Sequence, residues 1–302
     1  MLEELKMPAR KGVEEALLKS LFKHKGIIKE FGSGEEIVEE IADDFGLNEE
    51  QKTAYLETIY RKENRVKKSL LWHRLLFRAA DSLAKEKLVS RPTQTLKLTN
   101  TKEWMLTESG FDKALELLNI PAAKKDFLST KSYEVQKIVK KLNETNRPEN
   151  YNPFDKKKRV TKVSKETTLR KRGFRQAVTE AYDYKCAICG LKIYSPDSLS
   201  WEVEAAHIVP HRAMGKDDIW NGLALCHLHH WAFDVGWFTL QDNYKVQLSP
   251  QTVSLPINFG KIGNYEFLKL TANNSKILLP GRKNIYPHKN AINWHRENIF
   301  HQ

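Results

Sequence analysis

The sequence predicts an α+β protein of two domains joined by a basic segment, and three observations lead to this prediction. Apolar residues recur at helical spacing through the first 120 residues. Short strand-like segments alternate with clustered cysteines and histidines between residues 186 and 230. Positive charge is concentrated between these regions, because residues 121–182 contain 17 Lys and Arg against 7 Asp and Glu. We therefore expect domains at 1–120 and 171–302, with a basic linker at 121–170.

The N-terminal domain is predicted to be mostly helical. Val13, Leu17 and Leu21 are spaced for one face of a helix, and the apolar residues of 37–42 repeat this spacing. A long third helix is expected over 64–87, a short two-stranded wing over 88–100, and a capped last helix over 107–118. This order of helix, helix, long helix, wing and helix is that of a winged helix.

Three segments of this domain, Asn64-Arg65-Val66, 83–88 and 106–110, resemble the N-terminal domain of Mrr-type restriction enzymes. Residues 30–57 hold ten acids and one base, whereas residues 61–97 hold eleven bases and three acids. The third helix and the wing are therefore expected to face DNA, with contacts from Arg65, Lys67, Lys68, Arg74, Arg78 and Arg91. Two alternatives stay open: these side chains are merely solvated, or the winged helix binds protein.

Two pairs of potential metal ligands have the spacing of a zinc site. Cys186 and Cys189 are separated by two residues, and so are Cys226 and His229. Such a gap lets a tight turn present two ligands, and two such turns complete a tetrahedral structural zinc. His211 and His227 are left without an assignment and are interpreted as solvated surface residues.

The expected location follows from the cysteines and from the absence of long apolar stretches. All three cysteines belong to the zinc set, so a disulfide scaffold is not expected and a reducing compartment fits. No stretch reaches the roughly 20 apolar residues of a membrane span, and the first residues lack the features of a signal peptide. We therefore predict a cytoplasmic protein without membrane contact.

The segments around the zinc set follow one another in an order known from a nuclease family. They are the helical lead-in 172–182, the first cysteine pair, Ala206-His207-Ile208-Val209-Pro210, Asn221-Gly222-Leu223-Ala224-Leu225, and the segment 230–234. Over about residues 171–240 they resemble the HNH nuclease family, whose ββα-metal fold wraps two strands and a helix around a catalytic divalent ion. The resemblance implies that His207 and His230 are the catalytic histidines and that Asn221 is the asparagine between them.

Phosphodiester hydrolysis needs a base for the attacking water and a positive group for the developing charge. His207 suits the base, because a neutral imidazole has an ordinary pKa of about 6.5. His230 and Asp234 stand four residues apart on an expected helix and project from one face, where they are predicted to hold Mg²⁺ or Mn²⁺. Asn221 has two possible roles, as a ligand of that ion or as a hydrogen-bonded brace of its loop.

Ala206 departs from the common pattern of the family. The residue before the first histidine is usually an Asp or a His that binds the metal, and here it is Ala206. Alternation along a strand over 202–209 places Glu204 on the face of Ala206, so Glu204 is the nearest carboxylate that could supply the missing ligand. Water is the alternative ligand.

The basic linker leads directly into the predicted nuclease domain. Its positive charge is typical of a surface that contacts the phosphate backbone, with Lys157, Arg172 and Arg175 as candidates, although a solvated linker is the alternative. After the nuclease segment, residues 238–302 contain strand-like pieces and a terminal helix, which we expect to pack on the nuclease core.

Together these features predict a DNA endonuclease of restriction or defence type that uses one divalent ion and double-stranded DNA. The N-terminal domain is a candidate sensor of a modified base such as 5-methylcytosine. Because one core makes one nick, cleavage of both strands predicts a homodimer. The alternative class is a non-catalytic zinc-containing DNA-binding regulator, and RNA is a weaker substrate because no base-stacking sheet motif is present.

Overall fold

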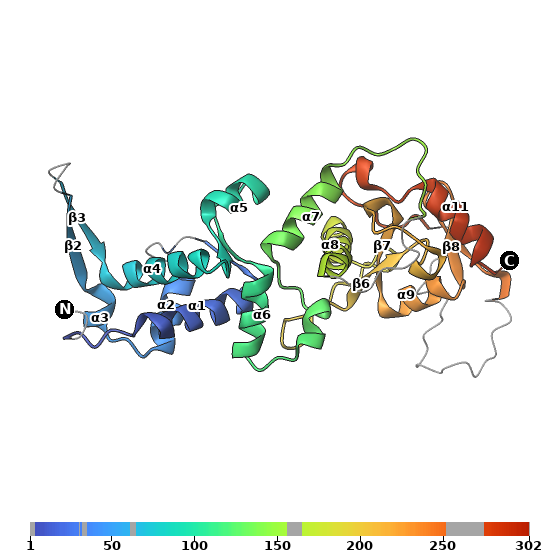
Figure 1. Ribbon diagram of the computed structural model, residues 1–302. Coiled ribbons are helices and arrows are strands. Elements are labelled where there is room, and N and C mark those ends of the chain that lie inside the picture. The colour runs from blue at the N-terminus through green and yellow to red at the C-terminus, as the bar shows by residue number, and fades with distance from the viewer. Residues whose placement is uncertain are drawn as a thin grey trace. The chain divides into compact units, whose positions relative to one another are not determined.

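The computed structural model describes residues 4–29, 31, 35–60, 65–155, 165–251 and 275–301. The chain forms two compact units, Met1–Gln136 and Lys137–Gln302 (Figure 1). Every helix within the described residues is too short or too polar to span a membrane.

The first unit has a helical core capped by a small sheet. Helices α1 (Arg10–Lys23), α2 (Glu36–Asp44), α4 (Leu71–Lys85) and α6 (Glu108–Leu117) bury Leu17, Ile41, Leu76 and Phe111 against one another. Strands β1 (Ile27–Ile28), β5 (Trp104–Leu106) and β4 (Val89–Ser90) pair antiparallel in that order. The helices predicted from the spacing of Val13 to Leu21, from 37–42 and from 107–118 are confirmed.

The third predicted helix is shorter than expected. Residues 65–70 form β3 (Arg65–Leu70), which pairs antiparallel with β2 (Tyr55–Tyr60), and only then does α4 begin at Leu71. The prediction of a helix from residue 64 is therefore wrong for its first turns. The segment 55–60 is rich in aromatic and β-branched residues and provides a strand whose backbone pairs with 65–70 along its whole length. The short helix α3 (Glu49–Thr53) precedes this hairpin.

The predicted wing over 88–100 is also wrong in detail. Only its beginning is a strand, β4, and residues 92–99 form helix α5 (Pro92–Thr99). Pro92 starts the helix with a preset φ, and the side chain of Gln94 accepts the amide proton of Arg91 at 3.0 Å. The second strand of this region is β5, so α5 stands where a tight turn was expected.

The second unit contains a two-stranded sheet between helices. Strands β6 (Val203–His207) and β7 (Gly222–Cys226) pair antiparallel, with α8 (Lys165–Ala181) and α9 (His227–Asp234) packed against them. Phe174 and Val178 of α8 and Phe233 of α9 are fully buried. This is the predicted strand, strand and helix order around the histidine segments.

The predicted linker contains regular structure. The 3₁₀ helix η2 (Ala122–Phe127) contacts α6, and α7 (Tyr133–Glu144) crosses the boundary between the two units. Lys125, a linker residue, forms ion pairs with Glu108 and Asp112 of the first unit. The basic run that includes Lys157 lies outside the described residues.

The C-terminal extension packs on the unit of β6, β7 and α9, as predicted. Strands β8 (Phe238–Leu240) and β9 (Val246–Leu248) form a hairpin, and α11 (Lys289–Asn298) lies against β8. His295 of α11 is 1% exposed: Nε2 lies 3.0 Å from the carbonyl oxygen of Phe233, and Nδ1 lies 3.0 Å from Oγ1 of Thr239. Burial lowers the pKa of His295 to about 4, so the helix is anchored by a neutral imidazole.

Candidate active site and zinc cluster

The four predicted zinc ligands, called the zinc cluster below, are brought together by a turn and by the junction of β7 with α9. Cys226 ends β7 and is the N-cap residue of α9, so His229 falls in the first turn of the helix. Cys186 and Cys189 lie in a turn closed by a hydrogen bond of 2.9 Å from the Gly190 amide to the carbonyl oxygen of Cys186. Gly190 has a φ of +75°, which a glycine adopts without strain.

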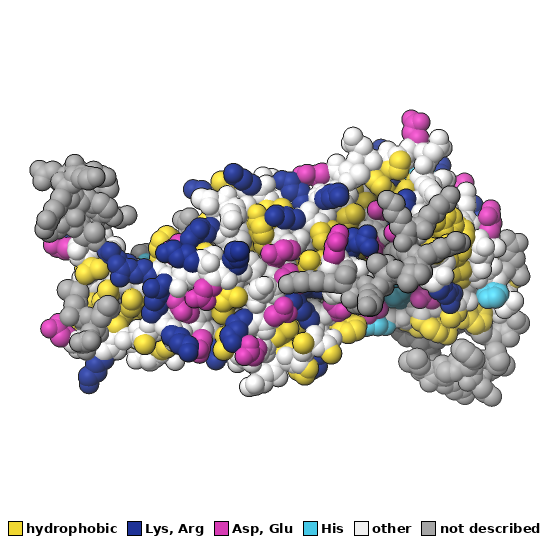
Figure 2. All heavy atoms as spheres, in the orientation of Figure 1, with side chains coloured by type: hydrophobic (Ala, Val, Ile, Leu, Met, Phe, Trp, Pro, Cys, Tyr) yellow, Lys and Arg dark blue, Asp and Glu magenta, His cyan; other side chains and the backbone are white. Residues whose placement is uncertain are grey.

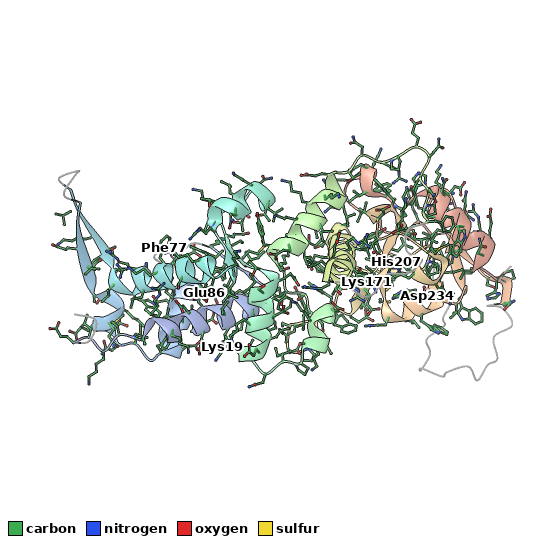
Figure 3. All side chains as sticks on the ribbon, viewed as in Figure 1. Lys19, Phe77, Glu86, Lys171, His207 and Asp234 are labelled. Atoms are coloured by element: carbon green, nitrogen blue, oxygen red, sulfur yellow. The ribbon has the colours of Figure 1, made fainter. Side chains whose placement is uncertain are left out.

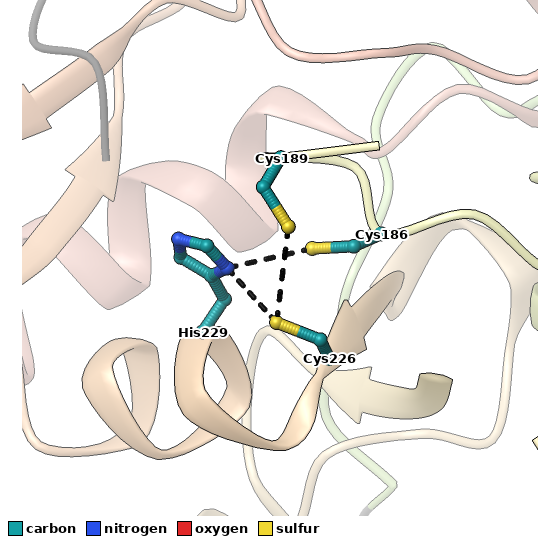
Figure 4. A group of neighbouring side chains, drawn as sticks. All are labelled: Cys186, Cys189, Cys226 and His229. Carbon is teal, nitrogen blue, oxygen red and sulfur yellow. Dashed lines mark hydrogen bonds between the residues drawn. The ribbon is translucent and has the colours of Figure 1, made fainter. Parts of the chain in front are cut away.

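The four predicted ligands converge on one point (Figure 4). One ligand atom from each lies within 4.8 Å of the others. The Sγ atoms of Cys189 and Cys226 are 4.0 Å apart, and Nδ1 of His229 lies 3.6 Å from Sγ of Cys186. A tetrahedral zinc with bonds of about 2.3 Å separates its sulfur ligands by about 3.8 Å, so the donor set fits this ion.

The turn is also tied to the strands of the site. The amide of Ala187 donates to the carbonyl oxygen of Ala224 in β7 at 2.7 Å. In turn, the carbonyl oxygen of Ala187 accepts from the amide of Leu278 at 2.8 Å. The zinc cluster therefore connects β7, the start of α9 and the C-terminal extension.

Asn221 is fully buried and its side chain holds the loop after β6. Its Oδ1 accepts from the amide of Val209 at 2.8 Å, and its Nδ2 donates to the carbonyl oxygens of Val209 and Lys216, both at 3.0 Å. Gly215 lies so close to Val209 that a Cβ added to this glycine would stand 1.7 Å from the carbonyl oxygen of Val209. Of the two roles left open by the sequence, this geometry favours the brace.

His207 ends β6 and meets side chains from two other elements. Its ring stacks on Phe174 of α8 with centroids 4.0 Å apart and planes 20° apart. The register of the sheet places Gly222 opposite His207, and an added Cβ at Gly222 would lie 3.1 Å from the Phe174 ring. The absence of a side chain at Gly222 therefore lets α8 approach the sheet beneath His207.

Asp217 is a site residue that the sequence did not reveal. Its side chain is 8% exposed, and its Oδ1 lies 3.1 Å from Nε2 of His207 and 3.3 Å from Nε2 of His211. His211 is exposed, as expected, but its ring centroid lies 4.2 Å from that of His207. These three residues form a second group of potential metal ligands. The sequence could not show which of Asp217 and Asp218 contacts His207, because both lie in a loop and not in a helix or strand.

His230 is held between two carboxylates. Oε2 of Glu204 lies 3.0 Å from its Nδ1, and Oδ2 of Asp234 lies 3.5 Å from its Nε2. The second distance fits two neighbouring ligands of one ion, for which bonds of about 2.1 Å give a separation of roughly 3.0–3.4 Å. Glu204 approaches the opposite nitrogen, so the three predicted ligands do not meet at one point. Glu204 also lies 3.3 Å from Nε2 of His227, a residue that was left unassigned.

The charges of His207 and His230 both act on the carboxylate of Asp234. Burial raises the pKa of Asp234, while the charges of His230, Arg212 and His207 act to lower it. The hydrogen bond from His230 lowers the pKa of Glu204 despite burial. His207 and Asp234 are labelled in Figure 3 within the same unit. The charge of His207, a potential base, therefore acts on Asp234, a member of the potential ion-binding pair.

The predicted DNA-contacting residues differ in their exposure and in the ion pairs that they form. Arg74 and Arg78 lie on α4, and Arg175 is exposed on α8. Lys68 and Arg91 form ion pairs with Glu57 and Asp81. Arg172, also on α8, is 6% exposed, and its contact with DNA stays a prediction. The side chains of Arg65 and Lys67 lie outside the described residues. On the face shown in Figure 2, Lys and Arg side chains alternate with acidic ones.

A comparison with protein-family models concerns the segment described above. A protein-family model described as HNH endonuclease matches residues 186–241. A solved structure titled modification dependent TagI restriction endonuclease is similar with a TM-score of 0.32 and 19% identity. That similarity covers 46% of this chain and 44% of the other, so the chain spans less than half of that protein's length. No curated protein matches. Residues 186–241, which hold both cysteine pairs, Asn221 and the catalytic-histidine candidates, thus form an HNH endonuclease domain.

Proposed function

We propose that the protein is a DNA endonuclease of restriction type that hydrolyses one phosphodiester bond per HNH domain with the help of one divalent ion. The observation that carries this proposal is the pairing of His207 with a buried carboxylate, next to the His230 and Asp234 pair, inside the matched domain. A purely structural zinc finger needs neither histidine group.

In the proposed reaction, His207 accepts a proton from water while the water oxygen attacks phosphorus and the bond to the leaving oxygen breaks. Nε2 of His230 and Oδ2 of Asp234 would hold an Mg²⁺ or Mn²⁺ ion, which would supply positive charge against the charge that develops on the phosphate and the leaving oxygen. Glu204 holds the other nitrogen of His230 and so fixes the ring orientation. Asn221 keeps the loop after β6 in place.

The first unit is proposed to be a winged-helix reader of DNA. Its element order, α1, β1, α2, α4, β4 and β5, with an antiparallel sheet in the order β1, β5, β4, supports this architecture. Arg74 and Arg78 on α4 are the candidates for backbone contact. Recognition of a modified base remains part of this proposal, as does a homodimer that cuts both strands.

Plasmid cleavage by His207→Ala tests the proposed activity. We expect the variant to lose cleavage in Mg²⁺ or Mn²⁺ while its zinc content and DNA affinity stay at the wild-type level. The control is His301→Ala, an exposed histidine near the C-terminus. A wild-type protein that nicks neither unmodified nor methylated plasmid would instead favour the non-catalytic zinc-containing regulator.

DNA-binding measurements, together with cleavage of matched plasmids with and without 5-methylcytosine, test the proposed role of the winged helix. We expect Arg74→Ala with Arg78→Ala to weaken DNA binding and to reduce its dependence on salt, because each phosphate contact releases counterions. Cleavage of both plasmid types at equal rates would remove modified-base recognition from the proposal.

A further inference from the structure

We propose that Asp217 is the positioning residue of the base, fixing both the ring orientation and the proton tautomer of His207. This inference rests on the proposed function of His207. It adds a carboxylate that belongs to neither the zinc cluster nor the pair of His230 and Asp234.

The first argument is the identity of the atoms in contact. Oδ1 of Asp217 lies 3.1 Å from Nε2 of His207. An ionised carboxylate can only accept a hydrogen bond, so the proton of a neutral imidazole must be on Nε2. The lone pair that takes a proton from water is then on Nδ1. Without this carboxylate, the ring would distribute its proton over both nitrogens and would often present the wrong one.

The second argument is that Asp217 itself is held in place. The side chain of Asn221 bonds to the carbonyl oxygen of Lys216, the residue before Asp217, at 3.0 Å. The backbone amide of Asn221 donates to the carbonyl oxygen of Asp218, the residue after it, at 2.9 Å. The carboxylate is 8% exposed, so its charge acts on the ring through little intervening water.

The third argument is that ring plane and ring rotation are restrained by different elements. Phe174 of α8 stacks on the His207 ring and defines its plane. Stacking still allows the ring to flip by 180° about Cβ–Cγ, which exchanges the positions of Nε2 and Cε1, and a hydrogen bond at Nε2 disfavours the flipped orientation. Phe174 therefore restrains the plane of the His207 ring and Asp217 restrains its orientation, and neither alone does both.

His207, His211 and Asp217 could in principle ligate a metal ion instead. Both histidines approach the same oxygen of Asp217, which is the geometry of one acceptor between two N–H donors. A metal on Nε2 of His207 would leave that ring as a ligand and not as an oriented base. The two roles differ in their dependence on metal concentration, which makes them separable by experiment.

The first test compares Asp217→Asn with Asp218→Asn, the same substitution one residue later. Asp218 is hydrogen-bonded to the hydroxyl of Tyr151 at 3.2 Å and serves as the matched control. For Asp217→Asn we expect kcat to fall by about 100-fold, because a base acts with its full effect only in the correct tautomer. The Kd for DNA and the Mg²⁺ concentration for half-maximal rate should stay within about twofold. Asp218→Asn should retain the wild-type kcat.

Three results would overturn the proposal: an unchanged kcat in Asp217→Asn, an equal loss in Asp218→Asn, or a large rise in the Mg²⁺ requirement. The last result would make Asp217 a metal ligand. Thermal unfolding of both variants identifies any loss that comes from unfolding.

A second test does not depend on cleavage. In protein with ¹⁵N-labelled histidine at a pH where the imidazoles are neutral, the His207 signals are assigned by their absence in His207→Ala. We expect the Nε2–H tautomer in the wild type and a mixture in Asp217→Asn. A wild-type ring protonated on Nδ1 contradicts the proposal. If no DNA is cleaved, the proposed function fails, but this measurement still decides the role of Asp217.

Discussion

Asn221→Asp separates the two roles that the sequence left open for this residue. The substitution keeps the size of the side chain and the oxygen that accepts from Val209. It replaces the NH₂ group that donates to the carbonyl oxygens of Val209 and Lys216. Each buried carbonyl left without a donor costs about 1–3 kcal/mol, so two of them cost roughly 2–6 kcal/mol. Folding free energies are about 5–15 kcal/mol, so the variant should lose a large part of its stability.

The assay is urea unfolding together with plasmid cleavage at a low temperature where the variant is still folded. We expect a loss of about 4 kcal/mol in the free energy of unfolding and a parallel loss of cleavage. Asn152→Asp is the control, because among the described residues the Asn152 side chain forms one hydrogen bond, in which its exposed Oδ1 accepts from the amide of Phe154. An Asp at a metal-ligand position would bind a divalent ion at least as well as an Asn. A stable and active Asn221→Asp protein would therefore refute the brace and support a ligand.

Three further changes test other parts of the second unit. Elemental analysis should find roughly one zinc per chain in the wild type and none in Cys189→Ser, and this variant should also unfold at a lower temperature; retention of zinc would exclude Cys189 as a ligand. The pKa of His295 is lowered from 6.5 to about 4, so its contribution to stability is complete above pH 6.5 and is lost as the pH falls toward 4. At pH 5 the wild type should have lost about 2 kcal/mol relative to pH 8; urea unfolding of His295→Gln should show no such pH-dependent component, and equal pH profiles would contradict the assignment. In Gly222→Ala the new Cβ would stand 2.4 Å from Cγ2 of Val178, so we expect a loss of about 1–3 kcal/mol and slower cleavage as Phe174 shifts under His207; unchanged melting and cleavage would show that α8 adjusts freely.

The zinc cluster could be predicted from the sequence because its geometry is local. Each pair of ligands comes from one turn or one helix start, where a gap of two residues determines how the side chains meet. The pair of His230 and Asp234 was predictable for the same reason, since one turn of α9 brings them within 3.5 Å.

Asp217 was not predictable because its position depends on contacts distant in the sequence. It lies in an irregular segment whose path is set by the side chain of Asn221 and by the close approach of Gly215 to Val209. Neither contact has a periodic signature. The side-chain hydrogen bonds of Asn221 could not be predicted either, because an asparagine before a strand has no preferred partner.

The first unit shows how tertiary pairing overrides local preference. The segment 65–70 precedes a strongly amphipathic helix, and the sequence predicts it as the beginning of that helix, but a strand at 55–60 pairs with it. Conversely, the polar segment 92–99 has β-branched residues and is still helical, because Pro92 and Gln94 provide a helix start. The helices over 10–23, 36–44 and 108–117 could be predicted, whereas the start of the third predicted helix and the conformation of the predicted wing depended on these partners.

The absence of an acid at Ala206 now has a structural explanation within the proposed mechanism. Ala206 is fully buried, so a carboxylate there would have to be accommodated inside the core. Glu204, two residues earlier on the same strand, instead reaches Nδ1 of His230 from the half-buried edge. His207 is paired with Asp217 in the same way. Each proposed catalytic histidine is thus oriented by one carboxylate from another element, and Glu204→Gln should impair ion binding while Asp217→Asn should impair proton transfer. Measuring the Mg²⁺ requirement and kcat of both variants side by side would show whether the two carboxylates divide the work in this way, and identical defects would refute the division.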